Sequence, residues 1–486
     1  MQVPDIAQIK KKREEFEAQL RTSHRFDLAS KRRNLMPQPN SNLLDLSTIL
    51  RMASEGSEPL LAASSLRKLL SVQADPPIQQ VIDAGFLPQL LGWMQRSDLP
   101  AFQYEACWAL TNIASGSHEH AEALVQRGIV PLIYMLLESA DVDVREQAAG
   151  LTANITRDSA KVRDAVLQTA GLSRLLKVLS ECPRPSLAMA VVAAVSNLCR
   201  GKPAPEYAVS RPALPYLAAM ILGIKDEETL KDCLWAISSM CEGEESRIQD
   251  LLETGVIPRL VVLARSEQTK VQHPALRCIG NVVVGSAQQT EKVLEAGLIE
   301  VLEVLVKSPK LTIRKEAAWI ASNLSAGPFP QLQRLLQSSL FPSLLSLLPS
   351  DSPTIQSEVF YALLNIALSD RREAPLFLLQ QGAVLVVKQV LESNTSPKVM
   401  QAALELIAAL LEAGKRHFTE SSEGRNQVCE EVERTGCLEA IEEMQKHTSN
   451  FVYSKAVKIL ESYFETEDPP DLLASSILAV PLHFHL

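Results

Sequence analysis

Asparagine recurs within apolar segments of this sequence at a nearly constant spacing of 42 or 43 residues. The series is Asn112, Asn154, Asn197, Asn281, Asn323 and Asn365, and one double step leaves Ser239 at the skipped place. A side-chain carboxamide both donates and accepts hydrogen bonds, so it can hold a peptide bond without reading side chains. Alternate residues of an extended peptide lie about 7 Å apart. Amides spaced regularly along one face could therefore bind the backbone of such a peptide.

A second series stands four residues before each Asn, one turn earlier on the same helix face. It reads Trp108, Gly150, Ala193, Trp235, Arg277, Trp319 and Tyr361. Parallel aromatic rings form slots for the aliphatic stems of Lys and Arg, with a cation–π attraction of about 0.5–2 kcal/mol each. Carboxylates lie near both series, at Glu105, Glu146, Asp158, Glu242, Glu316 and Glu358. A single helical Trp or Asn would be a core residue, but the shared phase predicts a receptor for an extended basic peptide.

The elements that must position these residues are helices. The apolar stretches are rich in Leu and Ala, and only 5% of the residues are aromatic, which favours helix over strand. A small residue before an apolar pair shares the same period, at Gly85, Gly128, Gly171, Gly255, Gly297 and Gly382. Each unit is expected to hold two long helices and a short one, which is typical of armadillo and HEAT repeats. Such units bury their apolar faces only by stacking, so we predict an all-α, right-handed superhelical solenoid of about ten armadillo repeats.

The first 33 residues form a basic arm. Nine Lys and Arg stand there against five Asp and Glu, a net charge of +4, which leaves −13 for the rest of a chain whose formal charge is −9. This separation favours binding of the arm to the acidic body or to an acidic partner, although a solvated charged tail is the alternative. We expect a basic segment over residues 1–34, a linker over 35–44, the solenoid over 45–465 and a tail over 466–486.

Composition and motifs argue against several other classes of protein. The content of 46% hydrophobic and 22% charged residues is typical of folded chains, and an acidic body repels nucleic-acid phosphates. The longest apolar run, residues 187–199, is about 13 residues, short of the roughly 18 needed to span a membrane, and predicts a buried helix. A phosphate loop, a GxSxG and an HExxH motif are absent from the sequence, so we expect neither an enzyme nor a cofactor.

Two groups of metal-ligand residue types are better explained as structural. His118 and His120 flank Glu119, but we interpret them as an exposed polar loop rather than a metal corner. Eight cysteines without a CxxC pair fit reduced thiols in the cytosol or nucleus. Four of them lie inside apolar helical stretches and are expected in the core: Cys107, Cys199, Cys233 and Cys278.

Several motifs resemble the importin-α (karyopherin-α) family of nuclear import adaptors. The most specific is WALTNIASG at residues 108–116. Further matches are LWAIS at 234–238, PALRCIGN at 274–281, KEAAWIASN at 315–323 and SNLCRGKPAP at 196–205. In addition, KKKREEFEAQLR at 10–21 and KRRN at 31–34 resemble the importin-β-binding segment of that family. The resemblance covers nearly the whole chain.

The resemblance implies two sites for basic nuclear localisation signals. The major site would use Glu105, Trp108, Asn112, Ser115, Gly116, Gln147, Asn154, Asp158, Asn197 and Trp235. Asp158 matches the acid that pairs with the key lysine of a signal. The minor site would use Glu242, Arg277, Asn281, Glu316, Trp319, Asn323, Glu358, Tyr361 and Asn365. The importin-β-binding and autoinhibitory residues would be Lys10, Lys11, Lys12, Arg13, Leu20, Arg21, Lys31, Arg32 and Arg33.

Departures from the family pattern predict a divergent member. The family has Trp where this chain has Gly150 and Ala193, so the major site should lose about 1–4 kcal/mol of cation–π and packing energy, or about one to three decades of affinity. The minor site should then be relatively favoured. Residues 35–44 extend at most about 36 Å, which argues against autoinhibition by residues 31–33. The family's acidic tail is thin here, with Glu465, Glu467, Asp468 and Asp471.

The partners implied by the resemblance are importin-β, proteins with basic localisation signals and, through the C-terminal repeats, an importin-α export receptor. Neither nucleic acid nor a membrane is expected as a partner, and the chain should shuttle between cytoplasm and nucleus. The alternative is an armadillo scaffold or regulatory protein that keeps the fold but serves one specialised partner and lacks general cargo binding.

Overall fold

The computed structural model describes residues 44–55, 58–72, 76–182, 184–349, 351–393, 396–417 and 426–464, and within these ranges it contains helices and no strand. The basic arm and tail lie outside the described residues, as does the linker except for Leu44. The chain divides into two compact units, Met1–Val256 and Ile257–Leu486. The all-α prediction is confirmed for the described part of the chain.

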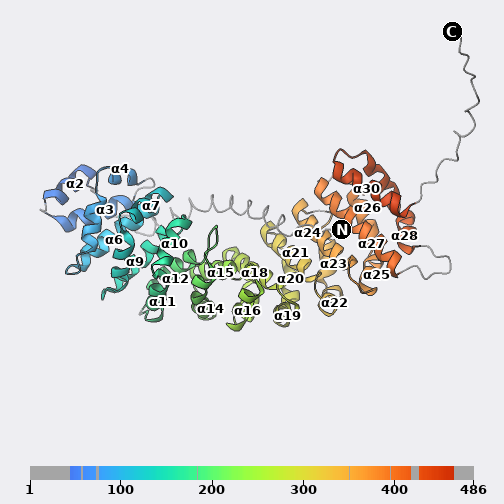
Figure 1. Cartoon of the computed structure of the whole chain (residues 1–486), viewed down its shortest axis with the longest axis horizontal. Coiled ribbons are helices and arrows are strands. Elements are labelled where there is room, and N and C mark those ends of the chain that lie inside the picture. Colours follow the sequence, from blue (N-terminus) through green and yellow to red (C-terminus); the bar gives the residue numbers. More distant parts are fainter. Residues whose placement is uncertain are drawn as a thin grey trace, which may run out of the picture. The chain divides into compact units, whose positions relative to one another are not determined.

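In the first unit, groups of short helices are each followed by a long one (Figure 1). The helices are α2 (Leu46–Glu55) and α3 (Pro59–Val72); α4 (Ile78–Asp83), α5 (Leu87–Met94) and α6 (Pro100–Ala114); α7 (His118–Gln126), α8 (Ile129–Leu137) and α9 (Val142–Ile155); α10 (Ala160–Gln168), α11 (Gly171–Ser180) and α12 (Pro185–Leu198); α13 (Tyr207–Ser210) with the 3-10 helix η1 (Arg211–Ala213), α14 (Leu214–Gly223) and α15 (Glu227–Met240); and α16 (Glu245–Glu253).

The second unit follows the same order. Its helices are α17 (Ile257–Leu263) and α18 (Thr269–Val283); α19 (Ala287–Glu295), α20 (Leu298–Leu305) and α21 (Leu311–Leu324); α22 (Phe329–Gln337), α23 (Leu340–Leu345) and α24 (Pro353–Ala367); α25 (Glu373–Gln380), α26 (Ala383–Glu392) and α27 (Pro397–His417); and α28 (Gln427–Thr435), α29 (Cys437–Glu443) with the 3-10 helix η2 (Met444–Lys446) and α30 (Asn450–Tyr463).

The long helix that closes each group is called the third helix below. Third helices pack directly on one another, in the order α3, α6, α9, α12 and α15 in the first unit and α18, α21, α24, α27 and α30 in the second. Small residues such as Ala106 and Ala148 are fully buried where these helices approach one another. Each unit therefore presents a row of parallel third helices, and the Asn series lies on this row.

The prediction of two long helices and a short one in each unit is wrong. The third helices span 14 or 15 residues, or 21 in α27, whereas the first and second helices span only 4 to 10. The recurring glycine explains the short pair, because Gly128 and Gly382 adopt left-handed backbone with φ of 79° and 75° at the start of a second helix. A helix cannot continue through such a residue, so the chain forms two short helices there instead of one long helix.

The group of α10, α11 and α12 has no glycine at the left-handed position before its second helix. Its left-handed residue is Ala170, with φ of 61°, whereas Gly171 is the first residue of α11. A Cβ atom on Gly171 would lie 2.8 Å from the Tyr134 hydroxyl and 2.8 Å from the Val166 carbonyl oxygen. Gly171 is thus required by a close approach of neighbouring chain segments and not by its own backbone angle.

The apolar core confirms two sequence predictions. The run at residues 187–199 forms α12, with Val191, Val192 and Val195 fully buried. Cys107, Cys199, Cys233 and Cys278 are all buried, and burial raises the pKa of Cys199 to about 12. Among the described residues no single helix is long and apolar enough to cross a membrane. The helices α25 and α26 reach the necessary length and apolar character only when they are counted together, and they are bent by 58° relative to each other.

Candidate peptide-binding site

The Asn side chains connect successive third helices. At four of these positions the amide Nδ2 donates a hydrogen bond to the preceding third helix, and the pairs are Asn112 to Ser71 Oγ (2.8 Å), Asn154 to Thr111 O (2.9 Å), Asn197 to Ala153 O (2.7 Å) and Asn365 to Ser322 O (2.8 Å). Three of the acceptors are the residue just before the matching Asn of the preceding repeat. One N–H of each of these four amides therefore holds the stack in register, a role that the sequence analysis did not predict.

The amides are consequently less accessible than a simple peptide-binding row would be. Asn112, Asn154 and Asn197 are only 5–8% exposed. Asn197 Oδ1 accepts two hydrogen bonds from Arg200, one from Nε at 3.2 Å and one from Nη2 at 2.6 Å. In the second unit, Nδ2 of Asn323 is buried and has no hydrogen-bond partner among the described residues. The number of amide N–H and C=O groups that internal contacts occupy therefore differs from one Asn to the next along the row.

Trp108 on α6 is part of a three-residue arrangement. Arg67 on α3 lies with its Cζ atom 4.5 Å from the centre of the Trp108 ring, and its Nε atom pairs with Glu105 Oε2 at 2.5 Å. The ring of Tyr104 meets Trp108 edge-on, with centroids 5.5 Å apart. An internal guanidinium therefore already uses the cation–π slot and the carboxylate that the sequence assigned to a ligand.

Trp319 on α21 repeats this arrangement in the second unit. Arg277 on α18 lies with its Cζ atom 5.8 Å from the centre of the Trp319 ring, and its Nη2 atom pairs with Glu316 Oε1 at 3.0 Å. Glu316 is only 3% exposed, and His273 Nε2 lies 3.6 Å from its Oε1. In both units the Arg comes from the preceding third helix and the Glu stands three residues before the Trp. The structure thus places Arg277 as an internal partner of Glu316.

Two further carboxylates, Glu146 near the Asn series and Asp158 of the expected major site, also have internal cationic partners. Glu146 Oε2 accepts hydrogen bonds from Arg184 Nη2 at 2.8 Å and from the Ser186 hydroxyl at 2.7 Å. Asp158 Oδ2 pairs with Arg157 Nε at 3.1 Å, and both side chains are 20% exposed. The charge that would attract a basic peptide to α9 is therefore largely balanced from within the first unit.

The two positions that lack an indole differ in the room they offer. Gly150 on α9 has open space where a side chain would begin, since no atom lies within 4 Å of a Cβ placed there. Ala193 on α12 is 9% exposed. Within the first unit, the row at this level thus contains Trp108 and Trp235 with two small residues between them.

The remaining expected site residues lie on or beside the third helices. Ser115 donates its hydroxyl to Asn112 O at 2.7 Å, and Gln147 and Trp235 are partly exposed. A Cβ atom on Gly116 would overlap the His120 ring, so glycine is required there by packing. Glu242 is exposed beyond the end of α15.

On α24 the expected minor-site groups are partly exposed. Glu358 accepts a hydrogen bond from the Ser322 hydroxyl at 3.4 Å. Burial raises the pKa of Tyr361, with smaller contributions from Glu405 and Glu358. Tyr361 stands one turn before Asn365 on the same helix, as Trp319 does before Asn323 on α21. Two adjacent third helices of the second unit therefore each carry an aromatic ring and an amide.

The histidine pair is a helix-capping feature. His120 Nδ1 accepts the backbone N–H of Ser117 at 3.1 Å and its Nε2 lies 3.2 Å from Gln79 Oε1, whereas His118 pairs with Glu119 at 3.1 Å. The two imidazoles thus have separate partners, and His120, the third residue of α7, forms a capping box with the N-cap Ser117. Within the part of the chain that the structure describes, no group of three or more His, Cys, Asp or Glu could hold a metal ion.

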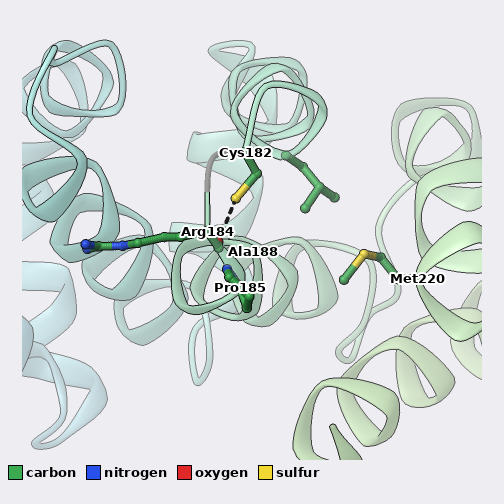
Figure 2. A pocket seen from close by; sticks show the side chains of 6 residues that line it. Cys182, Arg184, Pro185, Ala188 and Met220 are labelled. Carbon is green, nitrogen blue, oxygen red and sulfur yellow. Dashed lines mark hydrogen bonds between the residues drawn. The ribbon is translucent and has the colours of Figure 1, made fainter. Parts of the chain in front are cut away.

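A pocket of about 340 Å³ opens beside the start of α12 in the first unit. Its lining residues are Leu179, Cys182, Arg184, Pro185, Ala188 and Met220. Figure 2 shows the guanidinium end of Arg184 directed away from Met220, while Cys182 Sγ donates to the Arg184 carbonyl at 3.0 Å. The lining is mainly apolar, because the Arg184 guanidinium binds Glu146 and does not face the pocket.

Comparisons with known proteins agree with this architecture. The armadillo/beta-catenin-like repeat model matches residues 74–115, 117–157, 245–284 and 286–326, and the atypical Arm repeat model matches 426–476. The crystal structure of an engineered protein from the Northeast Structural Genomics Consortium superimposes with a TM-score of 0.75 and 26% identity, over 86% of this chain and 98% of that chain. The described helices therefore form armadillo repeats.

Importin-α subunits are among the related proteins. Importin subunit alpha-1b of Oryza sativa subsp. japonica is 42% identical over 231 residues, which is 48% of this chain and less than half, 43%, of that protein. Importin subunit alpha-4 of Arabidopsis thaliana is 34% identical over 416 residues, which cover 85% of this chain and 77% of that protein. Because this second similarity extends over most of both proteins, the chain belongs to the importin-α family.

Proposed function

We propose that this chain is a nuclear import adaptor. Basic nuclear localisation signals bind as extended peptides along the third helices, residues 8–34 bind importin-β, and the complex moves between cytoplasm and nucleus. The observation that carries the proposal is the recurrence of one arrangement, an indole with a carboxylate three residues earlier and an amide four residues later, on α6 and α21. Membership of the importin-α family supports the same assignment.

The second unit is the stronger binding site in this proposal. Arg277 stacks on Trp319 as Arg67 does on Trp108, but Tyr361 on the next third helix adds a second ring beside Trp319. A Lys or Arg stem of the ligand can then contact two rings, which favours binding. In the first unit, Gly150 and Ala193 supply no ring at the equivalent positions of the third helices that follow Trp108 and precede Trp235. Each missing ring removes about 0.5–2 kcal/mol of cation–π attraction.

Titration of a fluorescently labelled peptide with one Lys/Arg cluster tests this proposal. Trp319→Ala should weaken binding by about tenfold, consistent with the loss of one cation–π contact. Asp158→Lys, which reverses a charge in the first unit, should change the affinity by less than about threefold. If Trp319→Ala binds as the wild type does and Asp158→Lys abolishes binding, the assigned site preference is wrong. If the wild type does not bind the peptide, the adaptor function is wrong.

One observation favours a scaffold as the second candidate function. Internal arginines pair with Glu105, Glu146 and Asp158, three carboxylates that a basic signal would need. A scaffold would keep these pairs for stability and bind one specialised partner elsewhere. Retention of importin-β binding without any binding of basic peptides would favour this candidate.

A further inference from the structure

Arg157 lies two residues beyond the end of α9 and pairs with Asp158, the acid that a basic ligand would need. Its Nε atom lies 3.1 Å from Asp158 Oδ2, and each side chain is 20% exposed. The backbone N–H of Arg157 bonds to Asn154 O at 3.4 Å, which places the pair at the end of the helix that carries the central amide. A peptide lysine that approaches Asp158 therefore competes with the guanidinium of the adjacent residue, Arg157.

Neighbouring repeats add to this effect. Arg184 from α12 binds Glu146 on α9, and Arg200 covers the acceptor oxygen of Asn197. Arg67 from α3 stacks on Trp108 and pairs with Glu105. Each of these arginines makes a contact that the sequence predicted for a Lys or Arg of a basic peptide. In the first unit, side chains of the protein itself therefore provide the cations that contact these groups.

We propose that Arg157 is a specificity-determining residue that excludes a second basic cluster from the first unit. This inference rests on the proposed function, and it narrows the ligand class to segments with a single short Lys/Arg cluster bound in the second unit. A signal with two clusters then gains no affinity from its second cluster, because the Asp158 contact that would hold it is occupied. An intramolecular partner has the advantage, since it loses no translational freedom when it rebinds.

The pairing partners identify the test variants. Arg157→Gln removes the guanidinium and leaves Asp158 in place. Arg127→Gln is the matched control, because Arg127 is an exposed arginine at the end of α7 whose Nη1 bonds to Ala123 O at 3.1 Å. Both variants lose one positive charge from the first unit, so a difference between them reports the Asp158 contact and not the net charge.

The experiment measures the affinities of two synthetic peptides for the full chain by isothermal titration at fixed ionic strength. One peptide carries a single Lys/Arg cluster, and the other carries two clusters joined by a neutral linker of about ten residues. We expect the wild type and Arg127→Gln to bind both peptides within about threefold. Arg157→Gln should bind the two-cluster peptide about tenfold more tightly than the single-cluster peptide, as one additional charge-assisted contact would provide. Addition of Asp158→Asn should abolish this gain.

Two outcomes would overturn the inference while the proposed function stands. In the first, the wild type already prefers the two-cluster peptide by tenfold or more. In the second, Arg157→Gln and Arg127→Gln behave alike although both bind the single-cluster peptide. If no variant binds either peptide while circular dichroism shows all of them to be folded, both the adaptor function and this inference are wrong.

Discussion

The indole of Trp319 lies directly against the backbone of Gly280 on the preceding third helix. A side chain at residue 280 would overlap ring atom Cζ3 and lie 2.9 Å from Cε3. Gly280 immediately precedes Asn281, and Arg277 approaches the same ring from one turn earlier on α18. The position of this aromatic ring is thus set by a residue of the neighbouring repeat as well as by its own helix.

Gly280→Ala should displace the Trp319 ring and weaken binding of a single-cluster basic peptide by about tenfold, because the cation–π geometry is lost. Overpacking should also cost about 1–3 kcal/mol of the free energy of unfolding, partly offset by about 1 kcal/mol from the better helix propensity of alanine. Peptide titration and urea unfolding measure the two effects.

The matched control for that change is Gly150→Ala. No atom lies within 4 Å of a Cβ at residue 150, so alanine should raise the free energy of unfolding by about 0.5–1 kcal/mol and leave peptide binding unchanged. A Gly280→Ala variant with wild-type peptide affinity would show that the contact with Trp319 does not position the ring for binding.

Tryptophan at residues 150 and 193 should restore peptide binding to the first unit. Gly150 has open space for the indole, and the two rings together should contribute about 1–4 kcal/mol, or about one to three decades of affinity. The measurement uses a Trp319→Ala, Arg157→Gln background, in which the second unit is weakened and the guanidinium that pairs with Asp158 is removed. Absence of any gain would show that the remaining groups of the first unit do not form a peptide site, as the scaffold alternative requires.

The stability of the first unit should depend on the protonation of His120. Burial lowers the pKa of His120 from its ordinary value of 6.5, while the charge of Glu119 opposes the shift. The folded chain therefore binds this proton less readily than the unfolded chain, so the contribution is complete above pH 6.5 and is lost as the pH falls through the lowered pKa. Protonation would also remove the acceptor for the Ser117 N–H.

Urea unfolding of the wild type at pH 7 and at pH 5 checks this dependence. The unfolding midpoint should be lower at pH 5, and His120→Gln should reduce the difference because glutamine cannot be protonated. His118→Gln removes an exposed imidazole paired with Glu119 and is the control that should keep the wild-type difference. Equal pH dependence in all three proteins would contradict the assignment to His120.

Deletion of residues 1–34 should abolish binding to importin-β and change the affinity for a single-cluster peptide by less than about twofold. The first effect follows from the match of this segment to an importin-β-binding segment, and the second from a linker of at most about 36 Å. A pulldown with purified importin-β and a peptide titration measure them. An increase in peptide affinity of tenfold or more on deletion would instead show that the arm occupies the peptide site.

Periodicity was sufficient to predict the class of fold. The spacing of Asn112, Asn154 and Asn365 and the matching glycines indicated one repeating helical unit, and this prediction is confirmed because a repeat must place equivalent residues on equivalent faces. The lengths of the helices within the unit were not predictable in the same way. Left-handed residues such as Gly128 end the first helix of a group early, and only the backbone angles reveal this.

The sequence by itself determined the repeat, the helical class, the family and the residue types available on the third helices. The tertiary structure alone decided which partner each of those residues has. Arg67 and Trp108 are 41 residues apart, as are Ser71 and Asn112, and only stacking of α3 on α6 brings them together. Because a guanidinium can bind a carboxylate or an indole both from within the chain and from a ligand, the sequence could not distinguish an accessible recognition group from one that the next repeat already occupies.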